Sequence, residues 1–139
     1  MFPPQVTTEQ INAMSKGNML EHIGIVCTEV GKDYIVATMP VDHRTQQPYG
    51  LLHGGASVVL AESLGSIAAH CTIDSSKQFA VGLDINANHI RSAKSGVVTG
   101  ITRPIHIGRK TQVWEIKIHD ENEKLVCISR ITMAIVDKI

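Results

Sequence analysis

The chain has 139 residues, of which 43% are hydrophobic and 19% charged, and this balance predicts one globular domain spanning residues 1–139. Thirteen Lys and Arg balance thirteen Asp and Glu, so no global basic field exists to recruit nucleic acid or an acidic membrane. The three cysteines are odd in number and lack CxxC spacing, which argues against a disulfide framework or a zinc ribbon. Reduced thiols in a cytoplasmic protein are the simple expectation.

The N-terminal segment predicts a short helix. Thr7 is placed as the N-cap of a helix over residues 8–15, and Gln10 occupies the capping-box position. The first ten residues lack the charged region and apolar run of a signal peptide, so we expect no secretion signal there.

A β-hairpin and a polar loop are expected next. Residues 23–30 and 34–40 are β-branched and apolar, and a Gly-Lys-Asp turn separates them. The loop over residues 41–53 contains Pro48 and Gly50, which are typical of a turn-rich connection.

Residues 54–71 predict a long helix rich in Ala, Val, Leu and Ser. Its apolar side chains occupy most of the circumference, and a helix that is apolar all round is typically buried on all sides. Because Glu62 and several small polar residues interrupt it, a membrane span is not expected.

The remaining sequence predicts four strands. They cover residues 79–85, 96–103, 112–119 and 125–136. Pro104 is expected to end the second strand. Runs of strands with one central helix indicate the α+β class, here a curved antiparallel sheet wrapped around one long central helix.

The junction between the loop and the long helix could bind an anion. His53 is followed by Gly54 and Gly55, so backbone N–H groups and the positive end of the helix dipole lie uncovered at one point. This arrangement suits a developing oxyanion. The alternative is structural: His53 caps the helix, and the glycines allow close packing.

Glu62 is the only acidic or basic residue of this helix before His70. A carboxylate on an apolar helix is costly unless it is paired or placed at a cavity, and desolvation would tune it toward general-base work. Alternatively, Glu62 faces solvent or forms a structural salt bridge. Ser66 lies four residues further on the same helix face, where it could hold the carboxylate or a water molecule.

These two features cannot easily meet within one chain. Eight helical residues separate Gly54 from Glu62, which is roughly 12 Å along the axis. A base and an oxyanion donor must both lie within about 3 Å of the reacting atoms. If both serve one reaction, a twofold dimer with shared sites is expected, in which Gly54 of one chain lies near Glu62 of the other.

Basic residues late in the chain could bind phosphates at loops, although a solvated surface is an equal alternative. They are His89, Arg91, Lys94, Arg103, His106, Arg109 and Lys110. The seven histidines form no HxxxH or HExxH motif, so no metal site is expected.

The run QPYGLLHGGASVVLAES over residues 47–63 resembles the hotdog-fold thioesterases that carry a catalytic carboxylate on the central helix. The runs ATMPVD, VGLDINANH and QVW narrow the resemblance to the branch acting on 1,4-dihydroxy-2-naphthoyl-CoA in menaquinone biosynthesis, which is close kin to the proofreading thioesterase of enterobactin assembly. The resemblance implies that Glu62 is the base or nucleophile and that the Gly54 amide is the oxyanion donor. It also implies that His53 and Gln47 orient the thioester and that Ser66 holds the carboxylate or the attacking water.

The same resemblance implies an acyl-CoA substrate, no cofactor beyond the coenzyme A of that substrate, and sites shared between protomers of a dimer that assembles into a tetramer. The implied coenzyme A contacts are Gly82, His89, Ile90, Arg91, Ser92, His106, Ile107, Gly108, Arg109, Lys110 and Thr111. Two alternatives remain at this point. One is a broad thioesterase for phenylacetyl, benzoyl or aryl-carrier thioesters, and the other is a non-catalytic acyl-CoA binding protein.

Overall fold

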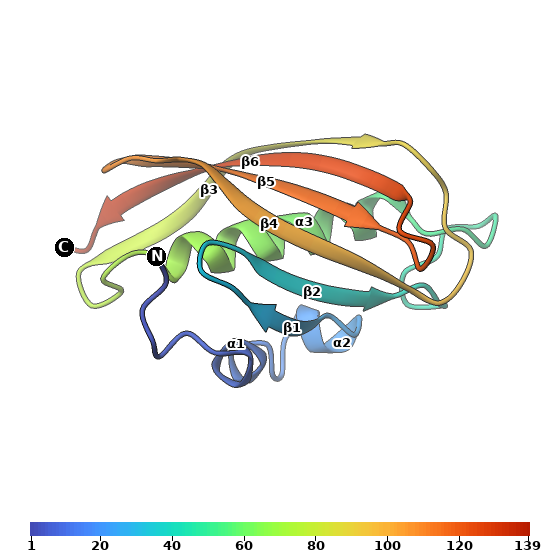
Figure 1. Ribbon diagram of the computed structural model, residues 1–139, viewed down its shortest axis with the longest axis horizontal. Helices are drawn as coiled ribbons and strands as arrows, with labels where there is room; N and C mark the ends of the chain where they lie inside the picture. The colour runs from blue at the N-terminus through green and yellow to red at the C-terminus, as the bar shows by residue number, and fades with distance from the viewer.

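The computed structural model describes all residues from 1 to 139 and contains one six-stranded sheet and one long helix (Figure 1). The strand order is β1-β2-β4-β5-β6-β3, and every neighbouring pair is antiparallel. The elements are α1 (Thr8–Met14), α2 (Met19–His22), β1 (Val26–Val30), β2 (Ile35–Pro40), α3 (Gly54–His70), β3 (Gln78–His89), β4 (Val97–Ile107), β5 (Thr111–His119) and β6 (Leu125–Asp137). The expected α+β hotdog fold is therefore confirmed.

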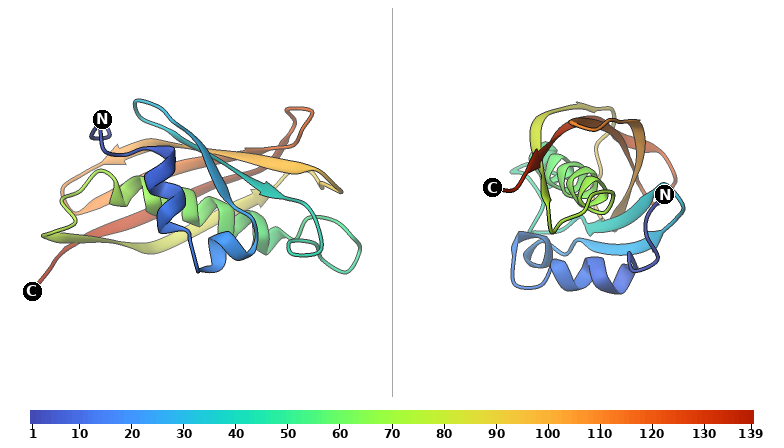
Figure 2. Two further views of the ribbon diagram at one scale, coloured as in Figure 1. Left: turned by 90° about the horizontal axis from the view of Figure 1, so that it is seen from below. Right: turned by 90° about the vertical axis from the view of Figure 1, so that its left-hand side faces the viewer.

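The sheet curves around α3, and the view along the helix shows it lying in the concave face (Figure 2). Leu60, Leu64 and Ala68 recur at helical spacing and are buried against the sheet. Gly65 lies on this face because a Cβ there would come within 2.4 Å of the Ile131 side chain. A fully buried Leu contributes about 1.5–3 kcal/mol, so this stripe anchors the helix to the sheet.

The expectation that α3 is buried on all sides is wrong for the single chain. Glu62 is exposed, and Val59, Ser63 and Ile67 are only partly covered. The sheet closes over one side of the helix, and α1 and α2 approach Ser63 and Ile67 on another side, so that Glu62 lies on the side left open.

The N-terminal helix forms as predicted, since Thr7 Oγ1 accepts the Gln10 N–H at 3.1 Å. The first hairpin begins later than predicted, at Val26, because a second short helix (α2) precedes it. Gly24 then adopts a positive φ of 81°, which turns the chain into β1.

Two strands are longer than predicted. β4 continues through Pro104 to Ile107, with a bulge between Pro104 and His106. The proline is tolerated because β2 pairs with β4 only as far as Thr102, so at this point β4 has a neighbour on one side only. β3 continues beyond Ile85 to the end of its pairing with β6.

The end of α3 is fastened to the sheet by a buried hydrogen-bond chain. The Trp114 indole N–H donates to Gln112 Oε1, and the Gln112 amide donates to Thr72 Oγ1, both at 2.8 Å. The Thr72 hydroxyl in turn donates to the Ala69 carbonyl of α3.

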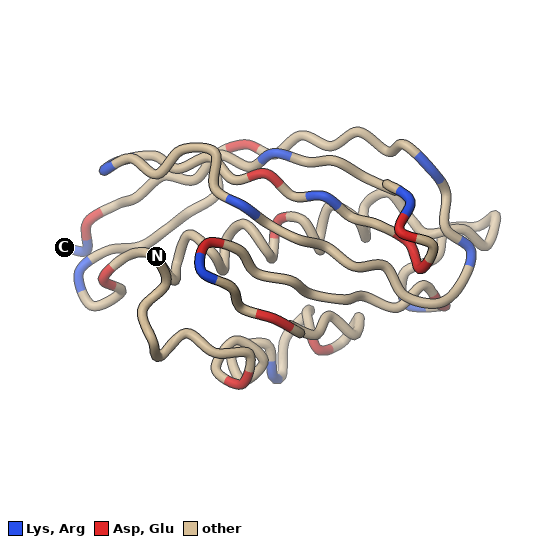
Figure 3. The backbone as a smooth tube through the Cα atoms, in the orientation of Figure 1, with Lys and Arg blue, Asp and Glu red and all other residues tan.

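Charged residues of both signs are interspersed along the chain (Figure 3). The described helices include none that is long and apolar enough to span a bilayer.

Candidate active site

The start of α3 presents one free backbone donor. His53 Nδ1 accepts the Gly55 N–H at 2.8 Å, so the histidine caps the helix, as the structural alternative expects. The His53 carbonyl accepts the N–H groups of Ala56 and Ser57. The Gly54 N–H has no hydrogen-bond partner in the chain. The cap and the candidate oxyanion donor are therefore adjacent and do not compete.

The Gly54 end of the helix opens into a cleft of about 360 Å³, which we call the amide cleft. It is lined by Gln47, Leu51, Leu52, Gly54, Ser57, His89, Ile90, Arg91, Ser92 and Val126. The His89 ring lies directly over Gly54, since a Cβ at Gly54 would stand 2.9 Å from His89 Nε2. The structure thus brings together Gln47, Gly54 and the predicted coenzyme A contacts 89–92.

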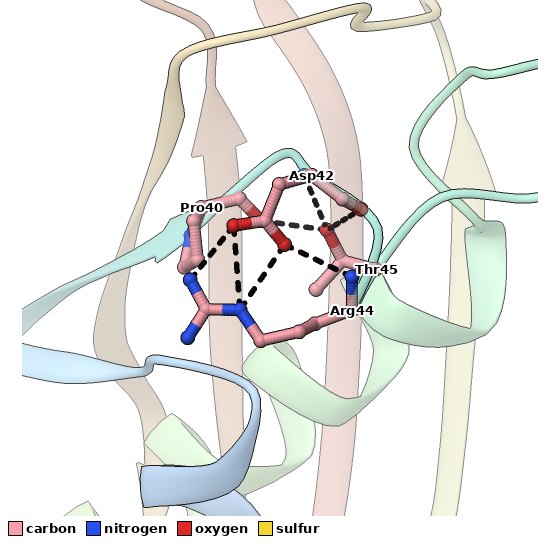
Figure 4. A network of polar contacts seen from close by, with 4 residues as sticks. All are labelled: Pro40, Asp42, Arg44 and Thr45. Carbon is pink, nitrogen blue, oxygen red and sulfur yellow. Dashed lines mark hydrogen bonds and ion pairs between the residues drawn. The ribbon is translucent and has the colours of Figure 1, made fainter.

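The 41–53 loop that carries Gln47 is held by a compact polar network (Figure 4). Thr45 Oγ1 donates to the Pro40 carbonyl at 2.6 Å, and Asp42 forms an ion pair with Arg44 at 2.7 Å. Hydrogen bonds from Arg44 lower the pKa of Asp42 to about 2. The Thr45 carbonyl accepts the His53 N–H, which places the helix start. Gln47 Oε1 accepts the Tyr49 N–H, so its side chain also shapes the loop.

Glu62 lies in a different, smaller cleft of about 140 Å³, which we call the carboxylate cleft. It is lined by Glu62, Gly82, Leu83, Asp84, Ile85 and Ile131. A Cβ at Gly82 would stand 3.6 Å from Glu62 Oε2, so the glycine leaves room beside the carboxylate. The side chain is exposed and has no hydrogen-bond or ion-pair partner, so the desolvation expected from the sequence is not supplied by its own chain.

Ser66 does not hold Glu62 in this structure. Its hydroxyl points at Met133 Sδ, 3.8 Å away, because Ser66 faces the sheet side of the helix at β6. The expected contact between Ser66 and the carboxylate is therefore not formed in the single chain.

The second group of predicted coenzyme A contacts, residues 106–111, lies at the opposite end of the sheet, at the turn between β4 and β5 (Figure 1). Arg109 and Lys110 line a cleft of about 530 Å³ together with Gln78, Ile135, Val136 and Asp137, which we call the basic cleft. The three clefts share no lining residue. In one chain, the predicted site is therefore divided among three places.

Several lining residues were not among the predicted site residues. Ser57 lies one helical turn after Gly54, so the helix period would have indicated it. Leu83 and Asp84 directly follow Gly82 in the chain, so their closeness to that predicted contact could have indicated them. Val126 reaches the amide cleft only through the pairing of β6, for which the sequence carries no local signal.

No three His, Cys, Asp or Glu side chains cluster closely enough to hold a metal ion. The three clefts offer a carboxylate, a free backbone amide and basic side chains as groups that could act on a substrate.

Comparison with known proteins places this arrangement in a family. Residues 49–127 match the model of the thioesterase superfamily. The 1,4-dihydroxy-2-naphthoyl-CoA hydrolase of Escherichia coli is 54% identical over 132 residues, which cover 94% of this chain and 96% of that protein. The proofreading thioesterase EntH of Cronobacter sakazakii is 52% identical over 130 residues, which cover 94% of each.

The fold has close counterparts among solved structures. A mutant thioesterase from Pseudomonas aeruginosa superposes with a TM-score of 0.96 at 47% identity and covers 99% of both chains. Together with the curved sheet and its central helix, these likenesses show that the chain belongs to the thioesterase superfamily and is a thioester hydrolase of the hotdog fold.

Proposed function

We propose that this protein hydrolyses an aromatic acyl-CoA, with 1,4-dihydroxy-2-naphthoyl-CoA of menaquinone biosynthesis as the foremost candidate, at sites shared by two chains. The Gly54 N–H would stabilise the oxyanion, and the Glu62 carboxylate of the partner would drive the attack. The observation that carries this proposal is the free Gly54 N–H at a helix start, opening into a cleft beside Gln47 and His89.

Glu62 could act in the reaction either as a base or as a nucleophile. As a base, Glu62 takes a proton from water while the water oxygen bonds to the thioester carbon, and the oxyanion forms at the Gly54 N–H. The C–S bond then breaks, and the departing thiolate receives the proton. As a nucleophile, the Glu62 carboxylate bonds to the thioester carbon and the C–S bond breaks, which leaves an anhydride and the coenzyme A thiolate. Water then hydrolyses the anhydride to the free acid and the Glu62 carboxylate, and a proton from this water goes to the thiolate.

A second chain is needed for either course. Gly54 and Glu62 open into separate clefts of one chain, and about 12 Å of helix lies between them. The partner would also cover the open side of α3 and supply the desolvation that Glu62 lacks. This dimer would form the unit from which a tetramer is built.

The substrate proposal draws on two relatives of similar likeness. One is named for the naphthoyl-CoA ester, and the other is named for proofreading. The second favours an alternative function, a broad thioesterase that removes unwanted aryl thioesters. Naphthoyl, benzoyl, phenylacetyl and short aliphatic CoA esters, assayed by release of free thiol, would separate the two. We expect kcat/KM for the naphthoyl ester to exceed that for the aliphatic esters by roughly 100-fold, or about 2.7 kcal/mol. Equal values across the panel would favour the broad thioesterase.

The role of Glu62 is tested by Glu62→Gln, which keeps the shape and removes the charge. Loss of a catalytic base lowers kcat by about 10²–10⁴-fold, while binding of the CoA ester should be retained. Glu121→Gln, at an exposed turn position that lines none of the three clefts, is the matched control. Turnover of Glu62→Gln at the wild-type rate would remove this residue from the mechanism.

A further inference from the structure

The Ser57 hydroxyl is a buried polar group without a partner in the chain. The residue is 1% exposed and lines the amide cleft, yet its hydroxyl makes no hydrogen bond. Every side-chain oxygen that is sealed from solvent in this chain has a partner, so the Ser57 oxygen must reach the surface. Because almost nothing else of the residue is exposed, the surface that it reaches is the amide cleft.

A serine inside a helix commonly donates to the carbonyl four residues earlier. Ser15, at the end of α1, does so, since its hydroxyl bonds the Ile11 carbonyl at 3.2 Å. For Ser57 the equivalent acceptor is the His53 carbonyl, which already accepts the Ala56 N–H at 2.9 Å and the Ser57 N–H at 3.2 Å. A carbonyl has two lone pairs, and both are in use. The Ser57 hydroxyl is therefore left for a group from outside the chain.

The backbone at the start of α3 offers only one donor to such a group. Oxyanion sites commonly aim two or more donors at one oxygen. The Gly54 N–H is free, whereas His53 binds the next three N–H groups through its ring and its carbonyl. A second donor on the same rigid helix must therefore be a side chain, and Ser57 supplies the only side-chain donor of α3 that lines the amide cleft.

We propose that the Ser57 hydroxyl is a second oxyanion donor, which acts together with the Gly54 N–H on one carbonyl oxygen. The inference rests on the proposed function in one respect, because it places the thioester carbonyl at the Gly54 N–H.

The helix geometry brings these two donors within reach of one acceptor. Residues three apart share a helix face, with about 5–6 Å between their Cβ positions. Helical side chains lean back toward the N-terminus, so the Ser57 side chain extends over the turn that contains Gly54. One oxygen can accept from two donors at about 2.9 Å each when the donors lie less than roughly 6 Å apart.

The surroundings of Ser57 favour a donor over a nucleophile. A serine nucleophile needs a base within hydrogen-bond reach to take its proton. His53 Nδ1 already accepts the Gly55 N–H, and the His89 ring packs over Gly54 without a hydrogen bond to Ser57. The hydroxyl therefore keeps its proton throughout, and the step adds a hydrogen bond to the oxyanion and no covalent bond to Ser57.

The variant Ser57→Ala tests the role in catalysis and separates it from a role in folding. We expect kcat for thioester hydrolysis to fall by about 10²-fold with little change in KM, because an oxyanion donor acts mainly in the transition state. The melting temperature should stay the same or rise, since the lost hydroxyl has no partner in the free protein.

Ser15→Ala is the matched control, because it removes a buried helix serine whose hydroxyl does have a partner. It should lower the melting temperature and leave kcat at the wild-type value. Wild-type kcat in Ser57→Ala would overturn the proposal. A fall in melting temperature as large as that of Ser15→Ala would also overturn it, by assigning the Ser57 hydroxyl to the fold.

A binding measurement tests which part of the ligand the hydroxyl contacts. S-benzyl coenzyme A is a thioether and lacks the carbonyl oxygen, so its Kd by calorimetry should be the same for Ser57→Ala and the wild type. Weaker binding to the variant would place the contact elsewhere on coenzyme A and contradict the oxyanion role.

If Ser57→Ala fails to fold, Ser57→Cys replaces the hydroxyl by a much weaker donor. This variant should lower kcat at least tenfold at unchanged KM, and wild-type kcat would again refute the proposal.

Glu62→Gln, assayed in parallel, separates this inference from the proposed function. Undiminished turnover of Glu62→Gln with a lowered kcat for Ser57→Ala would remove the carboxylate from the mechanism and keep the donor. Loss of turnover in Glu62→Gln with wild-type kcat for Ser57→Ala would remove the donor alone.

Discussion

Substitution of Gln112 by Leu should destabilise the fold by about 2–4 kcal/mol, although the volume is nearly conserved. Gln112 is 2% exposed and makes two hydrogen bonds, to Trp114 and to Thr72. The bond from Trp114 contributes roughly 0.5–1.5 kcal/mol, and leaving the fully buried Trp114 N–H without an acceptor costs about 1–3 kcal/mol more. The Thr72 hydroxyl keeps its bond to Ala69 and adds little. For a chain of this size, the midpoint of thermal unfolding should fall by roughly 10 °C.

The measurement is urea unfolding at one fixed chain concentration, because association would otherwise shift the midpoint. Gln78→Leu is the matched control, since the Gln78 amide bonds Asp137 at the surface, and its change should stay within about 0.5 kcal/mol. Adding Trp114→Phe removes the orphaned donor, so the double variant should be less destabilised than the sum of the single variants by about 1–3 kcal/mol. A loss below about 1 kcal/mol for Gln112→Leu, or strictly additive effects, would refute the reasoning.

Three further predictions follow from contacts around the site. Gly54→Ala should lower kcat/KM at least tenfold, because the added Cβ would displace the His89 ring into the amide cleft. The double variant Gly54→Ala/His89→Ala should then be no slower than His89→Ala alone. Additive losses in the two variants would contradict the steric cause. Asp42→Asn should lower the melting temperature at pH 7. Because the folded pKa of Asp42 is depressed to about 2, the stabilising effect is present above the unfolded value near 4 and vanishes as the pH falls through 2, so a difference that persists at pH 2 would argue against the ion pair. Burial raises the pKa of Cys71 to about 11, so this thiol should resist alkylation at pH 8 until the protein unfolds, as mass spectrometry before and after urea would show.

Much of the fold could be predicted because its local signals agree. The Thr7 cap, the apolar run from Gly54 and the alternation around Trp114 each point to the element that forms. The extent of β3 was missed because Asn86 and Asn88 are polar and resemble a loop, whereas the pairing partner, β6, determines where that strand ends.

The residues that mark the candidate site could be picked out from the sequence, whereas their positions in space could not. The Gly-Gly helix start and the lone Glu62 are visible in the sequence because both break an apolar pattern. The sequence left open whether Glu62 faces a cavity or solvent, since its exposure depends on which side of α3 the sheet leaves open. The contact of Ser66 with Met133 likewise depends on tertiary packing, and the spacing of residues along the helix does not predict it.

The division of the site among clefts that share no residue has a consequence for the kinetics of this enzyme. If Gly54 and Glu62 act together as proposed, a folded but solitary chain holds an oxyanion donor without a base and a base without an oxyanion donor, so it should hydrolyse no thioester. Specific activity should then fall when the protein is diluted, because the fraction of chains in dimers falls with the total concentration. Coenzyme A esters that bind both chains of a dimer should restore the activity. On the same proposal, newly made chains would hydrolyse no thioester until they associate.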